Sequence, residues 1–146
     1  MTSAKLPCER VLNSAFKERG RDDVVMIDVF PIRDGDQLKL TFEGKESPWR
    51  QGVWLKTDDH LTINGRQSQS VQLWHDTAPT EVLIECHTQN GYVHLYNIWD
   101  KGSGRESQSW SSGMLVEELP NGRRYHCNDI GFDTTFSRLV FRIERP

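Results

Sequence analysis

Short alternating segments, each closed by a turn, constrain the fold of this chain more than any other feature of its sequence. Within residues 37–43, Leu38, Leu40 and Phe42 alternate with polar side chains, which is the period of a strand with one buried face. Similar segments of about 5–9 residues continue from residue 23 to residue 145, with turn-forming residues between them. About nine or ten strands with a turn every 8–12 residues are typical of antiparallel all-β proteins. We therefore predict an all-β fold, an antiparallel two-sheet sandwich of jelly-roll type.

One short helix is expected near the N-terminus. Val11, Leu12 and Phe16 are spaced in part like an apolar helix face, and a nearby glycine supplies a stop signal. We predict a helix over residues 9–17. A chain of 146 residues can bury roughly 69% of its unfolded surface, and no linker divides it, so we expect one domain over residues 1–146.

Composition argues against several classes of protein. The chain has 18 Lys and Arg against 21 Asp and Glu, a net charge of −3, whereas nonspecific nucleic-acid binding needs clustered basic side chains. No apolar run approaches the ~20 residues of a membrane span, and the first residues lack the apolar stretch of a signal peptide. The odd number of cysteines, Cys8, Cys86 and Cys127, favours reduced thiols. We expect a cytoplasmic protein that binds neither nucleic acid nor membrane.

The dipeptide Asn90-Gly91 is a strong hairpin signal, because a tight type I′ turn needs positive φ at both central residues. With a two-residue loop, His87 would face His94 across the hairpin, and Cys86 would lie on the apolar face as a buried, reduced thiol. The opposite face would carry Glu85, His87, His94 and Tyr96.

This mixed face admits three interpretations. It could bind a polar ligand such as a sugar, which would stack on the ring of Tyr96 and hydrogen-bond to its neighbours. It could hold a divalent metal, with His87, His94 and Glu85 as the ligands of a cupin-like enzyme, although the His-x-His pattern of cupins is missing. It could also be an ordinary solvent-facing sheet surface.

Tryptophan is abundant, with five residues in one small domain. Trp54 and Trp74 alternate with apolar neighbours, so at least one of them should face away from the core and offer a stacking surface for a sugar. Trp110 ends a Ser- and Gly-rich loop over residues 101–110, which is longer than a hairpin loop needs to be. Core packing and plain loop flexibility are the alternatives for these residues.

A loop rich in oxygen ligands precedes the last strand, with Asn128, Asp129 and Asp133 as candidate ligands of Ca²⁺ or another divalent metal. A turn stabilised by Asn and Asp side chains is the alternative. The segment from Asn128 to Phe141 resembles the closing segment of some secreted calcium-associated jelly-roll domains, which have an acidic loop, then Phe, then Asp-Leu-Val. The resemblance implies a jelly-roll fold and a calcium site, but Arg138 stands where the family has an acid.

The sequence therefore favours a non-catalytic module that binds a carbohydrate or a similar polar small molecule. The ligand-binding residues would be Glu85, His87, His94, Tyr96, Trp54, Trp74 and Trp110. The alternatives are a metal-dependent cupin-like enzyme and a protein–protein interaction domain, and a homodimer is possible. None of the common nucleophile, zinc-protease or Cys-x-x-Cys motifs occurs.

Overall fold

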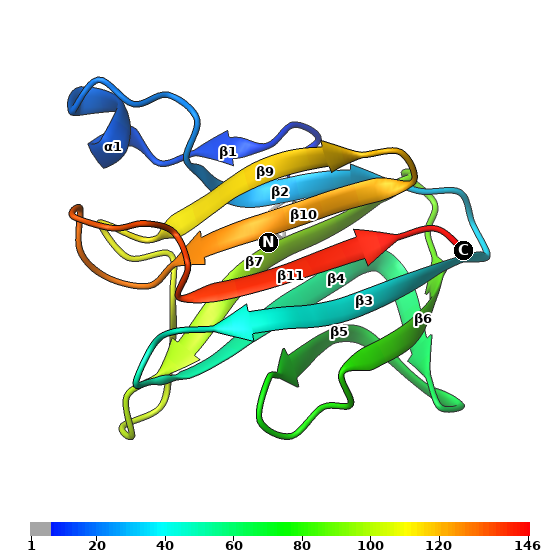
Figure 1. Ribbon diagram of the computed structural model, residues 1–146. Coiled ribbons are helices and arrows are strands. Elements are labelled where there is room, and N and C mark those ends of the chain that lie inside the picture. The colour runs from blue at the N-terminus through cyan, green and yellow to red at the C-terminus, as the bar shows by residue number, and fades with distance from the viewer. Residues whose placement is uncertain (1–6) are drawn as a thin grey trace, which may run out of the picture.

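The computed structural model describes residues 7–146, in which eight antiparallel strands close into a barrel and three further strands pair onto it (Figure 1). Residues 1–6, part of the predicted domain, lie outside the described range. The strands are β1 (Val11–Leu12), β2 (Val25–Pro31), β3 (Asp36–Lys45), β4 (Arg50–Ile63), β5 (Arg66–Trp74), β6 (Glu81–His87), β7 (Tyr92–Asp100), β8 (Arg105–Ser107), β9 (Gly113–Leu119), β10 (Gly122–Asn128) and β11 (Leu139–Glu144). Around the barrel the order is β2-β9-β10-β11-β3-β6-β4-β7 and back to β2.

The all-β prediction is confirmed, but the two-sheet jelly-roll sandwich is wrong because two strands join what would be separate sheets. β2 pairs with β9 at Val25 and with β7 from Asp28 onward. β4 pairs with β7 over residues 50–56 and with β6 over residues 60–62. Closure gives each of the eight strands a neighbour on both sides, which removes the open edges that a sandwich would leave.

The predicted helix over residues 9–17 is also wrong, because only the single-turn helix α1 (Ser14–Glu18) forms and β1 occupies residues before it. Asn13 is the cause. Its backbone is extended, and its side-chain oxygen accepts hydrogen bonds from the backbone N–H groups of Ala15 (2.9 Å) and Phe16 (3.4 Å). A helix capped in this way begins after the cap, so the residues before Asn13 are free to pair with β2.

A bend in β4 separates β6 from β7 and overturns the predicted hairpin. The carboxylate of Asp58 accepts hydrogen bonds from Thr88 Oγ1 (2.8 Å) and from the backbone N–H groups of Gln89 (2.9 Å) and Asn90 (3.0 Å). The turn after β6 is therefore held by β4. The two strands diverge, β6 toward β3 and β4, and β7 toward β4 and β2.

The barrel interior is largely apolar, and Gln51, Asn97 and Asp28 are buried polar side chains that make hydrogen bonds. Leucine, isoleucine and valine side chains alternate inward from the strands and are fully buried. Asp28 is also fully buried, and its carboxylate accepts hydrogen bonds from Tyr125 Oη, from Arg123 Nη1 (3.0 Å) and from Arg10 Nε (3.0 Å). These donors compensate the cost of burying the charge, and burial raises the pKa of Tyr125 well above its usual value.

Removal of the Asp58 carboxylate should loosen the turn between β6 and β7. Desolvation raises the pKa of Asp58, but the hydrogen bonds from Gln89, Thr88 and Asn90 together outweigh it, so the pKa lies below 3.8. The stabilisation is present above that value and is lost as pH falls through the lowered pKa. We expect Asp58→Ala to lower the free energy of unfolding by about 1–2 kcal/mol at neutral pH and by much less at about pH 2. Urea unfolding at both pH values measures this.

The matched control is Asp59→Ala, whose carboxylate bonds to His60 instead of the turn (2.7 Å). Equal losses from the two variants at neutral pH, or a loss from Asp58→Ala that does not depend on pH, would contradict this account of the turn.

Candidate functional site

The outer face of β5, β4 and β7 gathers the largest group of the predicted ligand residues. Residues that pair across neighbouring strands share a face of the sheet. In the observed register Trp54 lies opposite Tyr96 on β7, and Trp74 on β5 lies opposite Gly52, two residues before Trp54. We call Trp54, Trp74 and Tyr96 the aromatic face. It points away from the interior, because the alternate β4 residues, Val53 among them, are fully buried.

Trp54 and Tyr96 form a stacked pair. Their ring centroids are 4.5 Å apart and their planes differ by 10°. Tyr96 is buried beneath this contact, whereas Trp54 remains half-buried and so keeps part of its surface accessible. Stacking fixes the orientation of the indole, which leaves a rigid aromatic surface at low entropic cost to a ligand.

Trp74 is held between a glycine and an arginine. A Cβ atom at Gly52 would approach Cε3 of Trp74 to 2.9 Å, so the indole can lie against the backbone of β4 only because position 52 has no side chain. The guanidinium of Arg50 lies over the Trp74 ring, 4.4 Å from its centroid, and donates from Nε to both carboxylate oxygens of Asp76 (2.8 and 2.9 Å). The Arg50 hydrogen bond lowers the pKa of Asp76, so charged donors and acceptors stand beside the ring.

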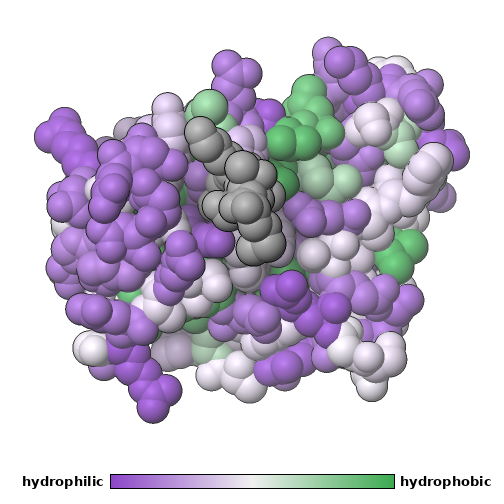
Figure 2. All heavy atoms as spheres, turned by 180° about the vertical axis from the view of Figure 1, so that it is seen from behind, coloured by the Kyte–Doolittle hydropathy of each residue, from purple (hydrophilic) through white to green (hydrophobic). Residues whose placement is uncertain are grey.

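Polar side chains surround the aromatic face. Gln72, opposite Trp54 on β5, is exposed, and Lys56, two residues after Trp54, is half-buried. β4, β5 and β7 lie behind β10 and β11 in Figure 1, and Figure 2 shows the molecule from that side. Most of the surface in that view is hydrophilic, with hydrophobic side chains only in small groups. Such a surface suits a polar ligand rather than a large apolar one.

His94 does not join Glu85 and His87. It lies opposite Lys56 on β4 and Val29 on β2, is fully buried, and its Nε2 contacts the backbone carbonyl of Pro7. The predicted pairing of His87 with His94 is therefore wrong.

Glu85 and His87 instead belong to a separate polar cluster on β6. The ring of His87 stacks on that of His60, with centroids 4.4 Å apart. His87 Nε2 lies 2.9 Å from Glu85 and Nδ1 lies 3.1 Å from Asp34. The hydrogen bond to Glu85 is the main cause that raises the pKa of His87, and Asp34 adds to it.

The predicted calcium ligands are occupied by protein donors. Asn128 and Asp129 are buried, and Asn128 Oδ1 accepts from Thr134 Oγ1 at 2.7 Å. Asp129 Oδ2 accepts from Ser47 Oγ (2.8 Å) and from Gln51 Nε2 (3.0 Å). In this arrangement the two side chains hold loops together at one end of the barrel.

The remaining predicted residues lie apart from the aromatic face. Trp110 is 72% exposed in the segment between β8 and β9, and Asp133 lines a shallow surface pocket with Glu46 and Arg138. Over residues 7–146, no group of three or more His, Cys, Asp or Glu side chains could hold a metal ion.

The cysteine prediction is confirmed for Cys86, which is fully buried and free. Burial, with smaller contributions from Asp36 and Glu85, raises the pKa of its thiol to about 12. Cys127 is also buried and free, and burial raises its thiol pKa well above 9.0. Neither buried thiol is suited to act as a nucleophile at neutral pH.

The sequence analysis did not predict several residues of the aromatic face and of the polar cluster on β6. Beside Trp74 these are Arg50 and Asp76, and beside His87 they are His60 and Asp34. Arg50 and Asp76 are 26 positions apart, His60 and His87 are 27 apart, and Asp34 and His87 are 53 apart. No local motif encodes contacts over such distances, since they depend on how β4 and β6 pair with their neighbours.

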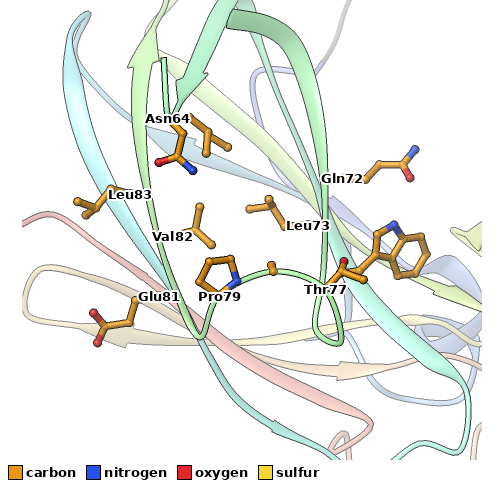
Figure 3. A pocket seen from close by; sticks show the side chains of 11 residues that line it. Asn64, Gln72, Leu73, Thr77, Pro79, Glu81, Val82 and Leu83 are labelled. Carbon is orange, nitrogen blue, oxygen red and sulfur yellow. The ribbon is translucent and has the colours of Figure 1, made fainter. Parts of the chain in front are cut away.

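A groove of about 340 Å³ lies between β5 and β6, and Gln72 and Leu73 of β5 are among the residues that border it (Figure 3). Leu73, Val82 and Pro79 point toward one another across it, and Asn64 lies at its upper end. Its walls combine aliphatic side chains with hydrogen-bonding groups, among them Asn64, Thr77 and Glu81. Trp74 also borders the groove, so the groove adjoins the aromatic face.

Comparisons with known proteins do not identify this chain. No protein-family model and no curated protein sequence matches it. One similar solved structure is that of the Chromobacterium violaceum lectin CV2L in complex with α-methyl-fucoside, with a TM-score of 0.47 and 12% sequence identity over 81% of this chain and 95% of the lectin chain. A similarity of this size assigns neither a family nor a ligand. Across the part of the chain that the structure describes, there is also no helix of the length and apolarity needed to cross a membrane.

The His87 cluster should be detectable by titration. Because the folded-state pKa lies above the ordinary value of 6.5, the cluster stabilises the fold below about pH 6.5 and loses that contribution as pH rises through the raised pKa. We expect NMR to give a His87 pKa above 6.5, and Glu85→Gln to lower it. Glu81→Gln, an exposed position on the same strand, should leave it unchanged. A His87 pKa at or below 6.5, or one insensitive to Glu85→Gln, is the contrary result.

Proposed function

We propose that this protein is a non-catalytic carbohydrate-binding module and that the aromatic face is its binding site. The observation that carries the proposal is the convergence of Trp54, Trp74 and Tyr96, from three neighbouring strands, on one outer face. Sugars present C–H groups that pack on aromatic rings and hydroxyl groups that need directional hydrogen-bond partners. The aromatic face offers the first kind of contact, and its neighbours offer the second.

The half-buried indole of Trp54 serves as the stacking surface, because Tyr96 supports it from behind. Arg50 and Asp76 supply fixed donors and acceptors for hydroxyl groups, and Gln72 adds an exposed amide. Nε of Arg50 contacts both oxygens of Asp76, which fixes the arginine in place, so the pair can select among hydroxyl arrangements.

The other predicted ligand residues take no direct part in this proposal. His94 is buried against Pro7, and Glu85 and His87 lie in their own cluster. The described residues do not support the alternative of a metal-dependent enzyme, because its expected ligands, His87, His94 and Glu85, do not converge.

A glycan array identifies a ligand, and calorimetry then measures its affinity for the protein and its variants. We expect Trp54→Ala to weaken binding by about 1–2 kcal/mol, roughly ten-fold, since one stacking ring is lost. Trp54→Phe should recover part of the affinity, because it restores a ring at the same position.

Trp110→Ala is the matched control, since it removes a tryptophan that is more exposed and lies outside the aromatic face. The proposal fails if Trp54→Ala, shown to be folded by circular dichroism, binds the identified glycan as tightly as the parent. It also fails if Trp110→Ala is the variant that loses affinity.

A further inference from the structure

β5 is the long unprotected edge of this molecule. Among the described residues its only strand partner is β4, so the other edge of its nine residues is open. The other two strands outside the barrel, β1 and β8, have only two and three residues. Proteins usually guard an open edge with charged residues, proline or shortness. From Gln67 to Leu73 this strand contains no charged residue and no proline.

The direction of the free backbone groups follows from the pairing with β4. The backbone N–H of His75 donates to Gln51 O at 2.8 Å, and hydrogen-bonded pairs alternate along an antiparallel ladder. Val71 and Leu73 therefore bond to β4. The N–H and C=O groups of Ser70 and Gln72 point outward, toward the open edge.

We propose that β5 is a homodimer interface, in which β5 of a second copy of this chain pairs antiparallel with it about a twofold axis centred on Val71. In this register Ser70 of each copy lies opposite Gln72 of the other. Both residues have outward-pointing backbone groups, so each of the two pairs can exchange two N–H···O bonds. The interface is isologous, as a twofold dimer requires.

The side chains on both faces of β5 are compatible with self-pairing. Val71 meets its own counterpart, which forms a β-branched apolar pair on the groove side of the strand. Val71 and Leu73 both line a second pocket beside β5, and Figure 3 shows Leu73 directed into the groove between β5 and β6. In the dimer, Val71 and Leu73 of the second copy would lie beside those of the first. The half-buried aliphatic side chains of the two strands would then cover one another.

Charge is also compatible with this register. Arg66, at the start of β5, is the only charged residue of the strand, so no charged side chain of the second copy's strand lies opposite it. No like charges oppose each other within the strand. Antiparallel pairs are destabilised by facing like charges, and here that cost is absent. A second copy fits better than an arbitrary peptide because the same strand supplies the free edge, the apolar side chains of Val71 and Leu73, and a segment without opposing like charges.

Sedimentation velocity over a wide range of concentrations tests the proposal. The parent protein should show a monomer–dimer equilibrium, and Val71→Lys should weaken the dimer at least about ten-fold because two lysines then face each other. A mixture of Val71→Lys with Val71→Glu should dimerise more tightly than either variant alone. Val11→Lys, on the short edge strand β1, is the matched control and should leave the dimer unchanged.

Ser70→Pro is a second, independent variant. It removes an N–H that points outward and therefore costs no hydrogen bond to β4, so the monomer should fold, as circular dichroism can confirm. The dimer should weaken, since its ladder loses donors. A parent protein that stays monomeric up to millimolar concentration overturns the proposal. So does a dimer that persists unchanged in folded Ser70→Pro and Val71→Lys. These outcomes do not depend on carbohydrate binding.

Discussion

The bend in β4 is the constraint on which the barrel and its outer surface depend. This strand pairs with β5 along much of its length, with β7 over its first half and with β6 near its end. Four residues between Lys56 and Leu61 leave the ladder with β5, and among them Asp58 holds the turn that follows β6. A carboxylate bonded to backbone N–H groups can fix a turn that has no ladder of its own. The bulge thus sets where two neighbouring strands run.

The aromatic face and the polar cluster around His87 both follow from this bend. The first half of β4 carries Trp54 between β5 and β7, which creates the aromatic face. The end of β4 carries His60 against His87 on β6. β4 therefore supplies Trp54 to the aromatic face and His60 to the polar cluster on β6, and the bend between them keeps the two sites apart. If β6 and β7 had formed a simple hairpin with a two-residue loop, His87 and His94 would have faced each other.

Sequence patterns predicted the strands well because alternation is a local property. Leu38, Leu40 and Phe42 are buried as predicted, and so is Cys86. The helix failed because a single capping side chain, Asn13, outweighed a weak helical pattern. The sandwich failed because closure depends on β2 and β4 each having partners in two places, and such long-range pairing leaves no mark on the sequence of either strand.

Register was the main obstacle to predicting the candidate site. Continued from its turn without a bulge, the β4–β5 hairpin would place Trp74 opposite Leu55, but the structure places it opposite Gly52. That shift brings a tryptophan over the one position of β4 that has no side chain. The sequence thus indicated Trp54, Trp74 and Tyr96 as candidates from residue type, whereas their common face and the role of Arg50 depend on a bulge that no local pattern reveals.

A residue-resolved NMR titration with a binding glycan tests the central claim most directly, because the indole N–H groups of the tryptophans give separate signals. The account predicts that the signals of Trp54 and Trp74 shift together with the backbone amide of Gln72 in a saturable way, while Trp110 stays unchanged. Shifts confined to Trp110 and its loop, or centred on Glu85 and His87, would contradict the assignment of the aromatic face as the site.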